Sequence, residues 1–268
     1  MAVNMRDNNF NATVVIPTHN ATWSLKNAIT SALLQDVDGI EILVVGDGAT
    51  AETQEIVMAF VQKSTNITFL DLPKSPNRGE YNRDVGVKSA QSENIFYLAD
   101  DDLLLPNHVS NLLPLLRNND LVQSLNGFID SEGQLALYPT DLSQQDKVDW
   151  HMQERPRNCV SITGTAHKKS TYLRLDSGWE VPPQDVWPDL HLWRKFFNMA
   201  GFKGQTHAQM TTIQFPSHMR KQSSEKEFRI IYEKWLDLSL HEDAEAFLEK
   251  HVRDSLLRTV IDLYSKLE

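Results

Sequence analysis

The chain has 268 residues, which is long for one hydrophobic core and short for two independent domains. Hydrophobic residues make up 41% and aromatic residues 9%, so a substantial core is expected and an intrinsically disordered chain is not. The formal net charge of −10 argues against a general nucleic-acid binder, because phosphate backbones attract basic surfaces. Cys159 is the only cysteine, which excludes an intrachain disulfide and a cysteine-based zinc cluster.

The sequence shows no targeting or membrane-spanning pattern. The first twelve residues hold no apolar run of signal-peptide length, and no later stretch has the length and apolarity of a membrane span. We therefore expect a soluble, cytoplasmic protein that at most lies on a membrane surface.

The first hundred residues alternate short apolar runs with helical periods. Strands are predicted at residues 13–16, 41–45, 67–72 and 94–99. The intervening segments have helical apolar spacing, and Thr50 is the expected N-cap of the second helix. Such alternation is typical of parallel βαβ units, so the fold class is α/β with a doubly wound sheet.

The second part of the chain is less regular. A helix is predicted at residues 106–116, with strands at 121–129 and 134–138. Residues 140–157 are polar and lack a clear period, and we interpret them as a loop over the site. From residue 223 onward the apolar spacing predicts two helices, which we interpret as packing or self-association elements of a possible homodimer.

Polar residues follow three of the predicted strands: Thr18 to Asn20, Asp47, and Asp100 to Asp102. In parallel α/β sheets, ligands bind outside the carboxyl ends of the strands, which is where these residues are expected. Three adjacent aspartates repel one another, and a divalent cation with a preference for oxygen ligands, Mg²⁺ or Mn²⁺, relieves that repulsion. The alternative is a solvated acidic turn that caps the helix beginning near residue 106.

Four stretches in order, VVIPTHN, EILVVGDGAT, NRDVG and FYLADDDLLLP, resemble the nucleotide-sugar-binding half of a family 2, GT-A-fold inverting glycosyltransferase. The resemblance implies a Rossmann-like, mostly parallel central sheet flanked by helices. It also divides the chain into a catalytic domain at 1–222 and a C-terminal helical extension at 223–268. Within the catalytic domain, residues 12–106 would bind the nucleotide-sugar and residues 107–222 the acceptor.

The resemblance also implies roles for the residues at the nucleotide. Pro17, Thr18 and Asn20 would border the base, and His19 between them would form part of the wall. Asp47 would accept a hydrogen bond from the uracil N3–H, and Arg78 would contact the nucleotide. The alternative roles are a turn residue for Asp47 and a surface salt bridge for Arg78.

The same resemblance implies roles for the three aspartates of the acidic run. Asp101 and Asp102 would bind the metal, with Asp100 nearer the ribose. His218 is preferred over His207 as a third metal ligand. The chain departs from the family pattern at Gly46 and Asp84, where an aspartate and an asparagine are common.

The segment QDVWPDLHLWRKFF resembles the family's Glu-Asp-x-x-Leu-Trp segment, which implies that Asp189 is the catalytic base. Asp185 is the reserve candidate, and the alternative role for Asp189 is a helix N-cap or a partner of the helix dipole. Trp179 and Trp187 flank this region and are either core residues or candidates for stacking on an acceptor sugar. Gly164 and Thr165 resemble the family's small-residue strand that faces the donor sugar.

We therefore predict a metal-dependent enzyme that transfers one sugar from a nucleotide-sugar, such as a UDP-sugar, to a carbohydrate or glycoconjugate hydroxyl with inversion. The family association suggests polysaccharide or glycoconjugate biosynthesis. A non-enzymatic scaffold that binds nucleotide-sugar or glycan remains the alternative. A sugar-1-phosphate nucleotidyltransferase is disfavoured because PTHNATWSLK has no glycine-rich loop, and a polymerising synthase because no membrane span or Gln-x-x-Arg-Trp motif is present.

Overall fold

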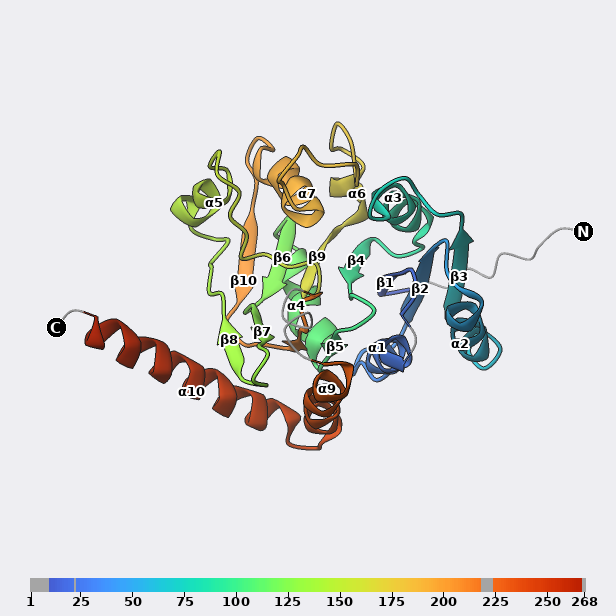
Figure 1. Ribbon diagram of the computed structural model, residues 1–268. Helices are drawn as coiled ribbons and strands as arrows, with labels where there is room; N and C mark the ends of the chain where they lie inside the picture. Colours follow the sequence, from blue (N-terminus) through green and yellow to red (C-terminus); the bar gives the residue numbers. More distant parts are fainter. Residues whose placement is uncertain (1–9, 22, 218–223, 267–268) are drawn as a thin grey trace, which may run out of the picture.

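The computed structural model describes residues 10–21, 23–217 and 224–266. A seven-stranded sheet lies at its centre, with the strand order β10-β6-β9-β4-β1-β2-β3 (Figure 1). Neighbouring strands pair in parallel except β9, which is antiparallel to both β4 and β6. The strands are β1 (Ala12–Thr18), β2 (Ile40–Asp47), β3 (Ile67–Leu72), β4 (Asn94–Tyr97), β6 (Leu121–Ser124), β9 (Thr165–Lys168) and β10 (Gly204–His207). The α/β fold with a mostly parallel sheet is confirmed.

Helices cover both faces of the first half of the sheet. Alternate residues of each strand point to opposite faces, and apolar side chains on both faces pack against helices. Val14 and Ile16 of β1 pack in one core with helix α1, whereas Val15 packs in a second core with Val87 of helix α3. Thr50 caps α2 as predicted, since its side chain accepts a hydrogen bond from the Thr53 N–H. The helices are α1 (Trp23–Leu33), α2 (Ala51–Val61) and α3 (Glu80–Ser89).

The predicted strand at 121–129 is two strands in different sheets. β6 joins the main sheet, and β7 (Gly127–Ile129) forms a hairpin with β8 (Leu135–Leu137). The chain changes direction at Asn126, whose buried side chain donates to the carbonyl of Cys159 instead of continuing an apolar pattern. Helix α4 (His108–Leu116) follows the acidic run as predicted.

The interpretation of residues 140–157 as a loop is wrong over part of its length. Residues Gln145–His151 form helix α5, which packs against α7 (Pro188–Phe197). Val148 and His151 are its buried residues, and Arg194 of α7 donates to the carbonyl of His151. Because one of these two buried residues is a histidine, the apolar period that would have revealed the helix is missing.

A short antiparallel ladder follows the acidic run directly. β5 (Leu103–Leu104) pairs with β11 (Thr212–Ile213), which brings two segments more than a hundred residues apart in the sequence to the same edge. The one-turn helix α6 (Lys169–Tyr172) follows β9 and precedes the segment that leads to α7.

The predicted C-terminal helices are α9 (Glu225–Leu240) and α10 (Ala244–Ser265). α9 begins with a capping box at Ser224 and packs on β5, while α10 runs beneath β8 (Figure 1). A third core joins both helices to β5, β7 and β8. The packing expected of the second half of α10 is not observed, because Leu256, Val260 and Leu263 are exposed there. Self-association through these helices stays a prediction.

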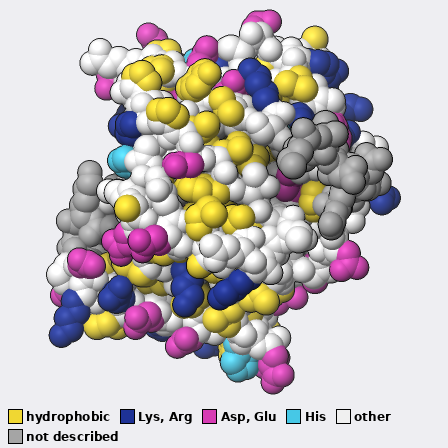
Figure 2. All heavy atoms as spheres, turned by 90° about the vertical axis from the view of Figure 1, so that its right-hand side faces the viewer, with side chains coloured by type: hydrophobic (Ala, Val, Ile, Leu, Met, Phe, Trp, Pro, Cys, Tyr) yellow, Lys and Arg dark blue, Asp and Glu magenta, His cyan; other side chains and the backbone are white. Residues whose placement is uncertain are grey.

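The surface shows mixed charge on the side that carries β3 and α2. Lys and Arg side chains lie scattered among Asp and Glu side chains across this face (Figure 2). In the part of the chain that the structure describes, no helix is both long enough and apolar enough to cross a membrane.

Candidate functional site

Two cavities lie at the carboxyl edge of the central strands. The first, about 260 Å³ in volume, is lined by the ends of β1 and β2, by the loop before α3 and by Asp100. The second, about 880 Å³, is lined by Asp101, Asp102 and Asp189 together with segments from the second half of the chain. Arg78, Ala99 and Ile162 line both cavities, so the two adjoin.

The end of β1 forms one wall of the first cavity. Pro17 and Thr18 lie on this wall, as the sequence predicts. Asn20 is exposed and lines neither cavity, so the structure does not bring it together with the other predicted nucleotide residues. His19 lies on the wall instead, and its Nδ1 is 2.7 Å from the backbone oxygen of Asp47.

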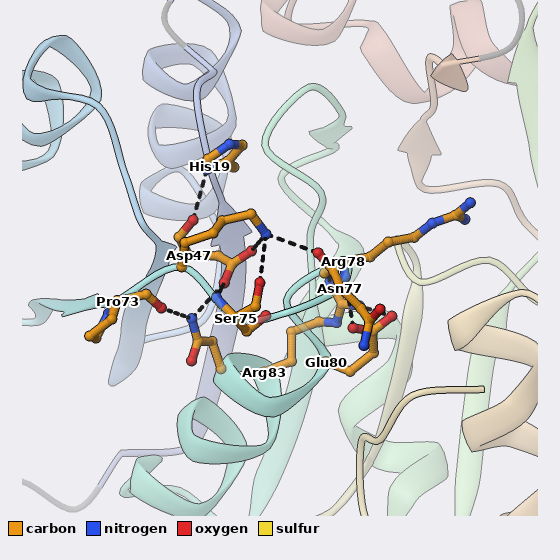
Figure 3. Close-up of polar contacts among 10 residues, drawn as sticks. His19, Asp47, Pro73, Ser75, Asn77, Arg78, Glu80 and Arg83 are labelled. Carbon is orange, nitrogen blue, oxygen red and sulfur yellow. Dashed lines mark hydrogen bonds and ion pairs between the residues drawn. The ribbon is translucent and has the colours of Figure 1, made fainter.

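Asp47, at the end of β2, is the centre of a polar cluster in the first cavity (Figure 3). Its Oδ1 accepts hydrogen bonds of 2.7 Å from the Ser75 N–H and from Asn82 Nδ2, and its Oδ2 accepts from Lys74 Nζ. Burial acts to raise the pKa of Asp47, but the bonds from Lys74 and Ser75 outweigh it and hold the pKa below its ordinary value. The carboxylate is therefore charged at neutral pH, and it anchors the loop that precedes α3.

Lys74 fastens the loop between β3 and α3 to Asp47. Its ammonium also donates to the backbone oxygens of Ser75 and Asn77, at 3.3 and 2.9 Å. Arg78 follows in the same loop, and its side chain extends away from the Asp47 cluster (Figure 3). Sequence reasoning missed Lys74, although the rule that polar residues follow strands, applied to β3, points to it.

Arg83 of α3 lies on the inner side of the first cavity, with its side chain only 12% exposed. Its guanidinium lies 4.6 Å from the ring centroid of Trp179 and donates to the backbone oxygen of Arg78. Trp179 is 4% exposed, so this candidate for acceptor stacking is a core residue.

The acidic run divides between the two cavities. Asp100 lines the first, whereas Asp101 and Asp102 line the second. Asp102 is oriented by two donors, since its Oδ2 accepts from Thr163 Oγ1 at 2.5 Å and its Oδ1 from the Phe215 N–H at 2.8 Å. The run does not cap α4, because β5 intervenes and the N-cap position of that helix is Asn107.

The carboxylates of the acidic run suit a metal ion whose coordination shell is completed by oxygen atoms of the substrate. In the described ranges, no group of three or more His, Cys, Asp or Glu residues is arranged to hold a metal ion. Mg²⁺ and Mn²⁺ commonly bind through one or two carboxylates plus phosphate oxygens and waters, which Asp101 and Asp102 fit. His207 lies on β10 and lines neither cavity, and His218 lies outside the described residues.

Asp189 lies in the first turn of α7 and lines the second cavity with Asp101 and Asp102. Its Oδ2 accepts from Asn158 Nδ2 and its Oδ1 from the Leu190 N–H, both at 2.9 Å. Burial raises the pKa of the Asp189 carboxyl above its ordinary value. The residue is not the N-cap, because Trp187 holds that position, but it lies in the first turn, where a carboxylate also interacts favourably with the helix dipole. Asp185 is exposed and lines neither cavity, which leaves Asp189 as the better placed carboxylate.

The second cavity has aromatic walls. Trp187 is 48% exposed and Tyr138 is 39% exposed, and both line it. Gly164 and Thr165 line neither cavity; Thr165 is fully buried in β9, and the wall is formed by Ser161 and Ile162 just before them. Asn158, Thr163 and the Phe215 N–H were missed because they lie in segments without apolar periodicity.

A GT-A-type domain is expected to combine a mostly parallel α/β sheet with a nucleotide site at the strand ends and an acidic run beside it. This chain has a cavity and an acidic run in those places. The sequence model of the family described as "Glycosyl transferase family 2" matches residues 13–172. The chain therefore belongs to glycosyl transferase family 2.

The curated relatives are similar over part of their length. An uncharacterized glycosyltransferase of Rickettsia prowazekii is 27% identical over 213 residues, which are 74% of this chain and 65% of the relative. An uncharacterized glycosyltransferase of Haemophilus influenzae is 28% identical over 140 residues, 51% of this chain and 54% of the relative. The chain thus spans between about half and two thirds of the length of these two relatives.

The fold is also found among solved structures. S. aureus TarS 1–349 superposes with a TM-score of 0.58 at 15% identity, covering 91% of this chain and 70% of that one. The same protein in complex with UDP-GlcNAc gives a TM-score of 0.55 at 13% identity, covering 91% and 71%. At these identities the likeness shows a shared fold.

Proposed function

We propose that this protein transfers a sugar from a UDP-sugar to a hydroxyl of a carbohydrate or glycoconjugate acceptor, with inversion and with Mn²⁺ or Mg²⁺. The observation that carries the proposal is that Asp101, Asp102 and Asp189 line one cavity, which adjoins a second cavity around Asp47. Family membership supports glycosyl transfer, and the UDP and UDP-GlcNAc complexes of TarS, which shares this fold, support a uridine nucleotide.

The first cavity would hold the nucleoside of the donor. Asp47 is charged and rigidly held, so it is suited to accept from a base N–H such as the uracil N3–H. Arg78 lines both cavities, and its guanidinium would contact the diphosphate of a donor that reaches from one cavity into the other. Asp100 lines the same cavity and would face the ribose.

The second cavity would hold the reacting groups. A divalent ion on Asp101 and Asp102 would supply positive charge for the departing diphosphate. As the acceptor oxygen attacks the anomeric carbon, the bond from that carbon to the diphosphate breaks and Asp189 takes the acceptor proton. Asn158 holds the Asp189 carboxylate in place through its 2.9 Å hydrogen bond. Inversion follows from the attack on the face opposite the leaving group.

The acceptor is proposed to be a sugar because of the exposed aromatic wall. Trp187 is two residues before Asp189 and about half of its surface is exposed to the cavity or solvent. An exposed indole face next to the base gives a sugar ring an apolar surface to stack on. We place the reaction in polysaccharide or glycoconjugate assembly on the ground of family association alone.

The departures from the family pattern do not favour a non-enzymatic scaffold. Asp84 accepts from the Tyr172 hydroxyl and from Lys88, both outside the two cavities. At Gly46, an added Cβ would lie 3.1 Å from the Phe69 ring, so a neighbouring aromatic side chain accounts for the small residue. Both departures have local packing reasons.

A thermal-shift matrix tests the proposal. UDP-, GDP- and dTDP-sugars are added with and without Mn²⁺ to the wild type and to Asp101→Ala, followed by transfer assays on a panel of sugar acceptors. Ligand binding to the native state raises stability by mass action, so a Mn²⁺-dependent shift with UDP-sugars is expected for the wild type only. Binding without turnover on any acceptor would favour the scaffold, and no shift with any donor would refute the proposed function.

A further inference from the structure

An aromatic cluster connects the C-terminal extension to the segment that follows β11. Phe215 lies 4.6 Å from Tyr232 and 5.8 Å from Phe228, measured between ring centroids, and both partners belong to α9. Trp23, the first residue of α1, lies 4.8 Å from Tyr232 and completes the cluster. Phe215 is 2% exposed and Tyr232 is fully buried, so the Phe215 ring is fixed by close packing.

Phe215, whose ring packs against α9, also contacts the acidic run through its backbone. The Phe215 N–H donates to Asp102 Oδ1 at 2.8 Å. The preceding strand β11 pairs with β5, with Ile213 opposite Leu103, the residue next to Asp102. Ring packing and strand pairing together therefore set where the Phe215 N–H points, and this N–H, with Thr163 Oγ1, orients the Asp102 carboxylate.

We propose that helix α9 is a positioning element of the site: Tyr232 and Phe228 hold the Phe215 ring, and the Phe215 N–H thereby fixes Asp102. The inference rests on the proposed function in one respect, the role of Asp102 as a metal ligand. It changes the meaning of the C-terminal extension, which the sequence alone presents as packing or self-association. Neither Tyr232 nor Phe228 lines either cavity, so both are positioning residues that act through Phe215.

The expected size of the effect follows from the behaviour of groups that orient metal ligands. Removing a hydrogen-bond partner of a ligating carboxylate typically lowers metal affinity by roughly 10- to 100-fold. A truncation at Tyr232 keeps the Phe215 N–H but frees its ring to move, so the lower end of that range is expected. Nucleotide binding without metal should not change, because Asp47 and its partners lie in the other cavity.

The experiment compares Tyr232→Leu with Trp235→Leu. Trp235 is also a buried aromatic of α9, but its Nε1 donates to the Gly133 carbonyl and its ring lies against His251. Tyr232→Phe keeps the ring and serves as the rescue, and Phe228→Leu is a milder variant should Tyr232→Leu not fold. Three quantities are measured: Mn²⁺ affinity in the presence of UDP by electron paramagnetic resonance, UDP affinity without metal, and amide hydrogen exchange at Phe215.

The proposal predicts that Tyr232→Leu, or Phe228→Leu in its place, weakens Mn²⁺ binding by roughly tenfold. It also predicts faster exchange of the Phe215 amide, with metal-free UDP affinity unchanged. Trp235→Leu should lower the melting temperature but leave the Mn²⁺ affinity and the Phe215 exchange as in the wild type, and Tyr232→Phe should resemble the wild type.

Two results would overturn the proposal: unchanged Mn²⁺ affinity and Phe215 exchange in Tyr232→Leu, or equal losses in Trp235→Leu, which would show a merely structural role. If the wild type binds no Mn²⁺ with UDP, the proposed function fails. Exchange at Phe215 then decides by itself whether α9 holds the donor to Asp102.

Discussion

Replacing Asp189 by asparagine removes the proposed base while leaving its surroundings in place. The amide has the size of the carboxyl group, and its oxygen can still accept one of the two hydrogen bonds now made by Asn158 and the Leu190 N–H. It cannot take a proton from the acceptor hydroxyl. A positioned base contributes about 10²- to 10⁴-fold, so kcat should fall by that factor, which corresponds to about 3–5 kcal/mol. Mn²⁺-dependent UDP binding should be retained.

The raised pKa of Asp189 predicts two further pH-dependent differences between the wild type and Asp189→Asn, one in rate and one in stability. Because burial raises the pKa of Asp189, the rate of the wild type should increase with pH through a value above 3.8, and this limb should be absent in Asp189→Asn. A carboxyl with a raised pKa in the folded state stabilises the fold below its unfolded pKa and loses that contribution as pH rises through the folded value. Asp189→Asn should therefore melt at a higher temperature than the wild type at neutral pH, with the difference shrinking as the pH falls through the raised pKa of Asp189 toward 3.8.

Asp185→Asn is the matched control. It makes the same chemical change four residues away, at an exposed position with a φ of 65°, a conformation that asparagine adopts readily. Its kcat and pH profile should equal those of the wild type. Initial rates of sugar transfer from pH 4 to 9, with calorimetric melting over the same range, measure both effects. Equal rate losses in the two variants, or an Asp189→Asn variant with near wild-type kcat, would refute the assignment of the base.

Three further predictions concern the donor site, the acceptor site and one departure from the family pattern. Lys74→Met should weaken UDP binding, measured by calorimetry, about fivefold, because it frees the loop that carries Arg78. The Lys74 side chain is 45% exposed, which limits the lost binding free energy to about 1 kcal/mol. Unchanged UDP affinity would contradict this anchoring role. Trp187→Ala should raise the KM for the acceptor about three- to tenfold with the donor KM unchanged, the loss of about 0.5–1.5 kcal/mol expected of an aromatic contact; a shift in the donor KM instead would argue against an acceptor platform. Asp84→Asn should leave donor binding and transfer rates unchanged, because an amide oxygen can still accept from the Tyr172 hydroxyl; a large loss of transfer would give Asp84 a role that its contacts do not show.

The fold and the nucleotide edge follow from the sequence because the same local pattern determines both. Apolar runs that alternate with helical periods predict parallel strands, and the carboxyl ends of parallel strands meet at one edge. That reasoning brings Thr18, Asp47 and Asp100 to a common cavity, and the structure has all three there. It does not fix how many residues after a strand still face the cavity. Asn20 was therefore predicted to border the base, although it lines neither cavity.

The partners of the candidate catalytic groups did not follow from the sequence for a different physical reason. Thr163 and Asn158 lie in an irregular segment, and Phe215 follows a two-residue strand, so none has a periodic pattern that marks it. Their hydrogen bonds to Asp102 and Asp189 span 31 to 113 residues and depend on tertiary packing. Helix α5 escaped notice likewise, because a histidine fills one of its buried positions.

The antiparallel strand β9 has a consequence for how the molecule can be divided. It lies between β4 and β6, and Thr163, two residues before it, binds both the Ala99 N–H and Asp102. A fragment that stopped after the acidic run would leave β4 as an open strand edge, prone to pairing with other chains, and would strip Asp102 of its hydroxyl donor. A chimaera that takes its acceptor specificity from a related protein should therefore keep the pairing of β9 with β4 and β6. The exchanged residues should come from the loops on either side of β9.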